Sequence, residues 1–507
     1  MRRWVLILAW MLSLGSAWAH VGSPNVIFQG EAAGRPVRVT IRPPEVIPGL
    51  AEITVQVEGG GVRRVTVLPL YWNAGRKGAP QPDEAIVPRG QTNLYSASLW
   101  FMRSGAYSVE VKLEADSGTT TLNVPVNAVA TNTRMMSPAY GSGLAVLGLI
   151  LFVGAVRISG ALFGESLLAP GEAVTRGRRW RGRWAMLVTS FLLAAAAYGG
   201  KKWWDYDERD YRNNRLYRPL PVSAEVRREK AQTILELKIE NRRGLWTSLL
   251  PDHGRMMHLF LVRLPDGNVL AHLHPLMRSV SRFEASLPPL PGGRYQVLAD
   301  VTRENGFAET LAAEVQIPEP SPGESRAWVG KPGDVICSTV STVRAGPDVF
   351  LAPDPDDSWH AGMEVGKPGE SVGTEGGYRI AWEGAGSWQV KRPVSLRFRL
   401  DGPEGRPAPL ELYLGMRGHA VVRRADGAVF SHLHPVGTFS MASQEFFQQT
   451  MSAEGASPPP PGHAGSAEPG PVSFPYEFPQ AGRYRVWVQM RSGGKIFTGA
   501  FDVEVKS

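Results

Sequence analysis

Cysteine is almost absent from this chain. Cys337 is the single cysteine among 507 residues, so no intrachain disulfide can form. A zinc site built from thiolates is excluded for the same reason. If the protein binds a metal ion, the ligands must be histidine, methionine or carboxylate side chains.

Acidic residues are fewer than basic ones, 47 against 55, which gives a formal net charge of +8. A basic chain can bind nucleic acid, but the arginines and lysines do not form one patch interleaved with aromatic residues. The densest basic cluster lies between residues 176 and 183, beside hydrophobic runs. We therefore expect a lipid bilayer, and no nucleic acid, as a partner of this protein.

Residues 1–19 have the composition of a secretory signal peptide. Arg2 and Arg3 precede an apolar stretch, and Ala17-Trp-Ala19 forms a small-x-small cleavage site. Cleavage there would make His20 the first residue of the mature chain.

Two further apolar runs, at residues 140–163 and 184–204, are long enough to be transmembrane helices. Residues 164–183 between them contain the basic cluster, and the positive-inside rule makes them a cytoplasmic loop. The segments before and after this pair would then be periplasmic. The sequence thus predicts a protein of the bacterial cytoplasmic membrane, and two buried core helices are the alternative.

The remaining sequence is rich in turn residues. Glycine (56) and proline (41) separate short runs in which apolar and polar residues alternate, as in half-buried strands. We predict a mainly β fold, with immunoglobulin-like β-sandwich domains at residues 20–131, 219–318 and 376–507. Residues 319–375 are rich in Pro, Gly and Asp and are interpreted as a linker. Within it, the acidic segment 356–360 is interpreted as a turn.

The second and third of these domains are internal repeats. Residues 258–275 and 419–435 each begin with histidine, contain Asp-Gly, and end in His-Leu-His-Pro. Both are followed by a Gly-Arg-Tyr strand, at Gly293 and at Gly482. Several elements recurring in the same order make chance a poor explanation.

Asp-Gly between two apolar runs predicts a β-hairpin. With Asp426-Gly427 as the turn, Val421 pairs with His432, and His419 lies across from His434. Side chains two apart on a strand share a face, so three imidazoles converge. The earlier copy has one extra residue, which a bulge or a longer loop must absorb. The predicted metal ligands are then His258, His272 and His274 in one hairpin, and His419, His432 and His434 in the other.

Three neutral imidazoles suit Cu(II), Zn(II) or Ni(II). Methionines lie nearby in the sequence, at Met257, Met416 and Met441, and thioethers favour Cu(I). Copper is therefore preferred over zinc. Asp252 and His253 are possible additional ligands for the second domain only. The alternative is that the histidines pack, or bond across strands, without a metal.

His20 is a further metal candidate, because a free α-amine and an imidazole can together chelate Cu(II). This start resembles that of CopC-type periplasmic copper proteins and of histidine-brace oxygenases. No second histidine follows in the first domain, so an oxygenase of that type is not expected.

The whole chain resembles a family of uncharacterised bacterial membrane proteins. The resemblance rests on residues 20–24, the paired His-Leu-His-Pro segments, and residues 251–263, 356–359, 415–421 and 437–441. It implies no activity. The hairpin also resembles small secreted domains described as heavy-metal-binding, which implies a metal.

Together these features predict a membrane-anchored periplasmic protein that binds copper for storage, delivery or sensing. It would pass copper to a copper-handling protein partner and have no catalytic residues. One alternative is a structural or partner-binding β-protein without a metal, and a further alternative is a metal-dependent enzyme.

Overall fold

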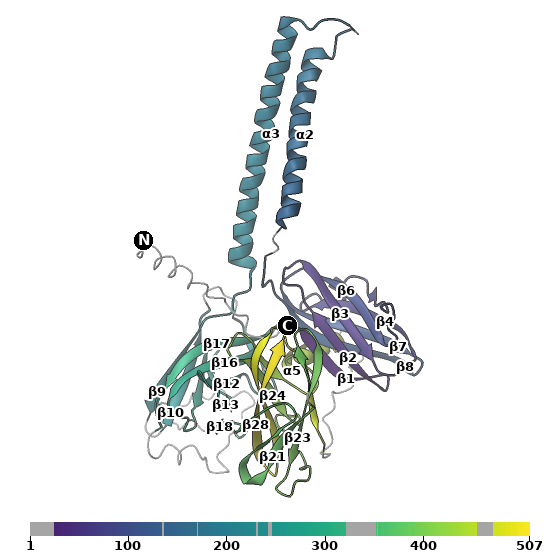
Figure 1. The fold of residues 1–507 in the computed structure, drawn as a ribbon. Coiled ribbons are helices and arrows are strands. Elements are labelled where there is room, and N and C mark those ends of the chain that lie inside the picture. Colours follow the sequence, from purple (N-terminus) through teal and green to yellow (C-terminus); the bar gives the residue numbers. More distant parts are fainter. Residues whose placement is uncertain are drawn as a thin grey trace. The chain divides into compact units, whose positions relative to one another are not determined.

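The computed structural model describes residues 25–133, 136–169, 171–229, 232–241, 246–320, 351, 353–384, 386–453 and 470–507. Strands make up 47% of the structure and helices 20%, which confirms the predicted mainly β class. The chain divides into two compact units (Figure 1). Of the described residues, those in one unit (residues 1–129 and 218–507) form the β-sheets, and those in the other (residues 130–217) form two long helices.

The first β-domain consists of two four-stranded sheets, β1-β2-β3-β6 and β5-β4-β7-β8. Along β3, alternate residues from Ala51 to Val57 are buried, as the sequence alternation predicts. The strands are β1 (Val26–Ala32), β2 (Arg35–Arg42), β3 (Gly49–Val57), β4 (Val62–Tyr71), β5 (Asp83–Glu84), β6 (Leu94–Phe101), β7 (Gly105–Ala115) and β8 (Gly118–Ala128), with the short helix η1 (Arg76–Gly78).

The second β-domain pairs the sheet β14-β15-β10-β9 with the sheet β11-β16-β12-β13-β18, to which β17 is added beside β16. Its core of leucine, valine and aromatic side chains takes residues from both sheets. The strands are β9 (Val222–Glu229), β10 (Gln232–Ile239), β11 (Leu249–Leu250), β12 (His258–Arg263), β13 (Val269–Leu273), β14 (Leu276–Ser279), β15 (Arg282–Ser286), β16 (Gly293–Arg303), β17 (Ala308–Ile317) and β18 (Ser358–Ala361).

The third β-domain has the sheets β20-β21-β23-β26 and β19-β28-β27-β24-β25, with β22 beside β28. Its core likewise takes residues from both sheets. The elements are β19 (Val365–Gly366), β20 (Ser371–Gly373), η3 (Glu375–Gly377), β21 (Arg379–Glu383), β22 (Trp388–Gln389), β23 (Pro393–Asp401), β24 (His419–Arg424), β25 (Phe430–Leu433), helix α5 (Met441–Ala453), β26 (Val472–Glu477), β27 (Gly482–Ser492) and β28 (Lys495–Lys506).

The interpretation of residues 319–375 as a linker is wrong for the part from residue 353 onward. Strand β18 pairs antiparallel with β13, and β19 pairs with β28. The edge of β13 would otherwise leave unpaired backbone groups, and β18 satisfies them. This segment therefore closes one sheet of the second domain before it enters the third.

The second and third domains pack face to face through the sheets that contain the histidine hairpins. Strand β12 is buried at five successive positions, and so is β13. Continuous burial means that both faces of a sheet are covered. One face lies on the domain's own core, and the other meets a cluster from both domains that includes Phe260, Leu298, Val421, Phe430 and Trp487. The sequence analysis did not predict this packing.

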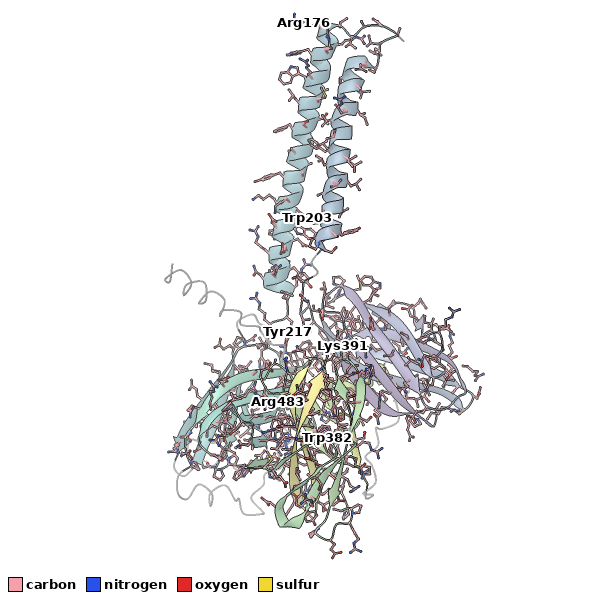
Figure 2. All side chains as sticks on the ribbon, in the orientation of Figure 1. Arg176, Trp203, Tyr217, Trp382, Lys391 and Arg483 are labelled. Atoms are coloured by element: carbon pink, nitrogen blue, oxygen red, sulfur yellow. The ribbon has the colours of Figure 1, made fainter. Side chains whose placement is uncertain are left out.

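The helical unit contains α2 (Pro138–Glu165) and α3 (Arg176–Asp210), followed by the turn η2 (Tyr211–Arg215). The prediction of a basic loop over residues 164–183 is wrong in its second half. Thr175 caps α3 by accepting a hydrogen bond from the Arg178 amide, so the arginine cluster forms the first turns of the helix. Figure 2 labels Arg176 at this end of α3 and Trp203 toward the other.

Helices α2 and α3 pack closely where small residues meet. A Cβ atom added to Gly182 would lie 2.8 Å from the Gly160 carbonyl oxygen, and the Ser159 and Thr189 hydroxyls are 2.7 Å apart. Close approach at small residues with a hydroxyl contact is typical of helices in lipid. Among the described residues, α2 is the one helix long and apolar enough to cross a membrane, and it is scarcely buried.

Candidate metal centre

The two hairpins have the predicted strand register. Val421 pairs with His432, and in the second domain Phe260 pairs with His272. Continuing each register places His419 opposite His434 and His258 opposite His274. The extra residue of the second-domain copy lies at the hairpin end, where residues 263–269 separate the last pair, Val262 and Leu270. In the third domain the shorter segment 424–429 separates Arg423 and Phe430.

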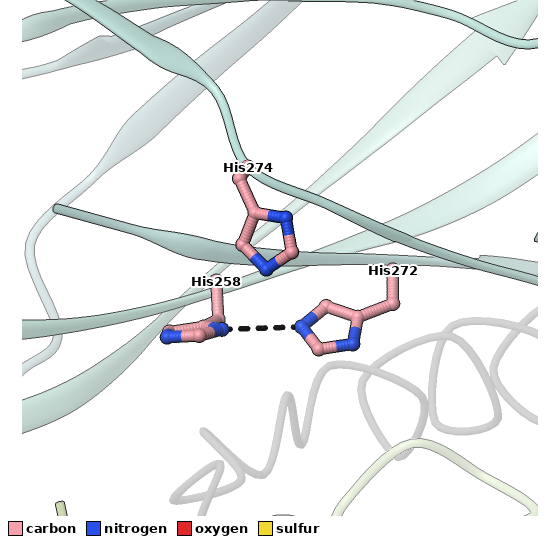
Figure 3. Close-up of side chains that lie close together, drawn as sticks. All are labelled: His258, His272 and His274. Carbon is pink, nitrogen blue, oxygen red and sulfur yellow. Dashed lines mark hydrogen bonds between the residues drawn. The ribbon is translucent and has the colours of Figure 1, made fainter. Parts of the chain in front are cut away.

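Each hairpin brings three imidazoles together on the face that meets the other domain. We call them the second-domain trio (His258, His272, His274) and the third-domain trio (His419, His432, His434). In each trio, one nitrogen per ring lies within 4.8 Å of the other two. Figure 3 shows the three rings of the second-domain trio turned toward one another.

Within each trio, the first and middle histidines face each other through ring nitrogens. His258 Nδ1 is 3.1 Å from His272 Nε2, and His419 Nδ1 is 3.2 Å from His432 Nε2. Two nitrogens that bind one ion at about 2.0–2.1 Å lie about 3–3.4 Å apart. The spacing of both pairs therefore fits shared coordination.

The outward nitrogen of the first histidine bonds to a backbone carbonyl six residues earlier. His258 Nε2 is 3.1 Å from the Asp252 oxygen, and His419 Nε2 is 3.0 Å from the Tyr413 oxygen. A carbonyl can only accept, so each of these nitrogens must hold the ring proton. In a neutral ring, the inward Nδ1 is then a bare lone pair.

The last histidine of each trio is held in the same way. His274 Nδ1 is 3.0 Å from Asp357 Oδ1, and His434 Nδ1 is 3.1 Å from the Phe439 carbonyl oxygen. Both rings therefore have the proton on Nδ1. Among the described residues, neither inward Nε2 has a hydrogen-bond partner. A buried lone pair without a partner is costly, and a bound cation would remove that cost.

The middle histidines are supported from the opposite domain. His272 Nδ1 is 3.0 Å from Gln489 Oε1 and 3.2 Å from the Tyr413 hydroxyl oxygen, both from the third domain. His432 Nδ1 is 3.5 Å from Asp300 Oδ2 of the second domain. Outer partners of this kind fix the tautomer and orientation of metal-binding histidines. Each trio therefore depends on the other domain for its geometry.

Burial favours the neutral form of five of the six trio histidines. It is the largest cause that lowers the pKa of His258 to about 3 and that of His434 to about 4. For His272, His419 and His432, burial and the neighbouring imidazoles hold the pKa well below its usual value. Metal ions compete with protons for these nitrogens, so both sites stay ready for a cation at neutral pH.

Four supporting residues were not predicted as parts of the site. The sequence analysis placed Asp357 in a turn rather than in the site; the turn is present, but Asp357 also belongs to the site, because its carboxylate orients His274. Asp300 and Gln489 pair with the first histidines, His258 and His419, in equivalent registers. The sequence did contain a pattern that could have identified both. Asp300 is the polar residue seven positions after Gly293, and Gln489 is the polar residue seven positions after Gly482, each within a mainly apolar strand. Tyr413 shows no such pattern.

The structure places the other predicted ligands less favourably. Met257 is wrong as a ligand, because it lies in the core of the second domain with Leu259, on the face opposite to His258. Met416 lies in a turn and Met441 begins α5, and both remain predictions. His20 lies outside the described residues.

Comparison with known proteins assigns no activity. No curated protein sequence matches this chain. Residues 371–507, the third β-domain, match a family described as a domain of unknown function (DUF8832). Dimeric latent PorU from Porphyromonas gingivalis is 8% identical, with 95% of this chain and 34% of that chain covered and a TM-score of 0.14. A Corynebacterium diphtheriae protein described as membrane anchored is 10% identical, with 95% and 96% covered and a TM-score of 0.14. Such scores support no conclusion about fold or function.

The metal-free protein is expected to lose stability as the pH falls from about 6.5 toward about 4. Histidines with a lowered folded pKa contribute stability above their unfolded pKa and lose it as they must become protonated. Burial raises the pKa of Asp300 to about 7 and also raises that of Asp357, which acts in the opposite direction. Five trio histidines have a lowered pKa and only these two carboxyl groups have a raised one, so we expect the net effect of acid to be a loss of stability.

Urea unfolding of the metal-free protein at pH 7.5 and 5.0 would measure this loss. His434→Gln should reduce the pH dependence. An unfolding free energy that is equal at the two pH values would contradict the prediction.

Proposed function

We propose that this protein is a membrane-anchored metal-binding protein that holds copper in its paired β-domains outside the cytoplasm. The strongest support is that each buried trio brings one nitrogen of every imidazole ring to a common point. The nitrogens on the outer side of the rings bond to acceptors, which leaves the inner nitrogens unprotonated and able to bind a cation. Imidazole-only ligand sets suit Cu(II) and Zn(II). Copper is the stronger candidate if Met416 or Met441 contributes a thioether.

The membrane anchor is part of the same proposal. Helix α2 has many exposed large apolar side chains, among them Leu147, Ile150 and Leu151, and lipid would cover them. We propose that α3 spans the bilayer beside it, with its arginine-rich start in the cytoplasm. The β-domains would then be periplasmic and of immunoglobulin type, and the cargo would go to a copper-handling partner.

A metal-dependent enzyme is the second candidate, favoured by the carboxyl group of Asp300 beside His432. Its raised pKa, about 7, is in the range of a general acid or base. Against this candidate, His258, His272 and His419 are at most 2% exposed, which leaves a substrate little access. Burial favours storage, delivery or sensing over turnover.

The test is a metal titration of the full-length protein in detergent. The wild type is expected to bind Cu(II), Cu(I) and Zn(II) with affinities high enough to compete with a chelator. Replacing His432 and His434 with glutamine should lower the stoichiometry, whereas His360→Gln, outside both trios, should not. Equal binding by all three proteins, or no binding by any, would contradict the proposal.

A further inference from the structure

A turn precedes each hairpin of the repeat, at residues 252–255 and 413–416. The two turns differ at their second residue, which is His253 in one and Leu414 in the other. Asp252 bridges to Arg255, and Tyr413 bridges to Met416. The second residue of each turn has a positive φ, 50° for His253 and 49° for Leu414. Each is followed by a glycine with φ near 75°. His253 and Leu414 therefore occupy equivalent positions, but the second domain has an imidazole where the third has an alkyl group.

The His253 ring lies nearer to the trio of the other domain than to the trio of its own. Its centroid is 5.3 Å from that of His434 and 5.5 Å from that of His419, but 6.3 Å from that of His258. The side chain is 11% exposed. Among the described residues its Nε2 has no hydrogen-bond partner. This is a seventh, mostly buried imidazole with a free nitrogen beside the third-domain trio.

A carboxylate lies at the same place. Asp252 Oδ1 is 3.6 Å from His253 Nε2 and also has no hydrogen-bond partner among the described residues. Its other oxygen, Oδ2, accepts a hydrogen bond of 2.8 Å from Ser440 at the start of α5. Neutral imidazoles bring no charge, so a carboxylate beside them favours a cation. The equivalent residue in the third domain is Tyr413, which is not charged at neutral pH.

The two trios also lie next to each other. The ring centroids of His258 and His432 are 5.4 Å apart, and those of His272 and His432 are 5.7 Å apart. Neighbouring rings within one trio are separated by a similar distance, 5.4 Å between His258 and His272. The rings of the two trios are thus in direct contact, so ions bound by the two trios would be close neighbours.

We infer that the trios are unequal halves of one dinuclear metal centre, in which His253 of the second domain is the fourth imidazole ligand of the third-domain trio. The second-domain trio keeps three histidine ligands, because Leu414, at the turn position equivalent to His253, has no ligand atom. This inference rests on the proposed metal binding. It adds that one ion is held by ligands from both domains, and therefore links them.

The experiment uses the full-length protein in detergent, titrated with Cu(II) and followed by chelator competition and electron paramagnetic resonance. The wild type should bind two ions per chain, with a resonance signal weaker than its copper content because neighbouring ions couple magnetically. In His253→Asn, one ion should keep its affinity, and the other should bind about 100-fold more weakly. The remaining ion should then give its full signal.

Asparagine is chosen because it tolerates positive φ, and Leu414→Asn is the matched control at the equivalent turn. His253→Leu is the second variant should the asparagine protein not fold. Two tight sites in a folded His253 variant, or two uncoupled ions in the wild type, would overturn the dinuclear centre and leave the proposed function standing. A wild type that binds no metal would instead refute the proposed function itself.

Discussion

Replacing Trp487 with alanine is expected to lower the free energy of unfolding of the β-sheet unit by about 3–5 kcal/mol. This side chain is fully buried and packs in the cluster between the second and third domains, with Phe260 and Val421. Its removal leaves a cavity at the contact that brings the two trios together. We therefore also expect weaker metal binding, measured on the same protein by chelator competition.

Trp100→Ala is the matched control, because Trp100 is 56% exposed on β6 of the first domain. Its effect should stay within about 0.5 kcal/mol. Trp487→Phe should cost less than alanine, since the indole Nε1 has no hydrogen-bond partner among the described residues and its loss carries no bonding penalty. If Trp487→Ala cost no more than Trp100→Ala in urea unfolding, the packing of the two domains would be refuted.

Replacing Gln489 with leucine is expected to weaken metal binding at the second-domain trio by about 10–100-fold. The Gln489 amide nitrogen donates to Ser358 Oγ at 2.8 Å and lies 3.2 Å from Thr498 Oγ1, which turns its oxygen toward His272. Leucine fills a similar volume but cannot accept from Nδ1. The His272 ring then loses the nearer of its two Nδ1 partners and keeps only the Tyr413 hydroxyl, although all three histidines remain.

Gln56→Leu provides the control, because Gln56 is exposed on β3 of the first domain. It should leave both metal affinities unchanged. The third-domain trio should also be less affected by Gln489→Leu, since its middle histidine is supported by Asp300 instead. Equal affinities in Gln489→Leu and the wild type would show that Gln489 does not orient the site.

The trios could be predicted from the sequence because a β-hairpin is a local structure. Side chains alternate with a period of two, and Asp426-Gly427 sets the turn, so the facing of His419, His432 and His434 follows by counting. Met257 was proposed only because it is near His258 in the sequence, and the same counting puts this neighbour of His258 on the opposite face. It could not place the extra second-domain residue, because a loop or a bulge would absorb it equally well.

The supporting residues could not be predicted because they come from distant parts of the chain. Gln489 and His272 are 217 positions apart, and no local period connects them. Asp357 reaches His274 only because β18 pairs with β13, within a segment whose composition is typical of a linker. His253 precedes its own trio in the sequence, but its ring lies closer to the histidines of the other domain.

The sequence by itself determined the β class, the repeat and the two groups of three histidines, because strand period and turn chemistry act over a few residues. Only the tertiary structure decided that the two histidine faces meet. Packing against Phe260, Phe430 and Trp487 buries both faces, which lowers the pKa of five of the imidazoles and gives each trio its partners from the other domain. Burial and proximity between remote segments depend on how whole sheets pack, and no local pattern encodes that.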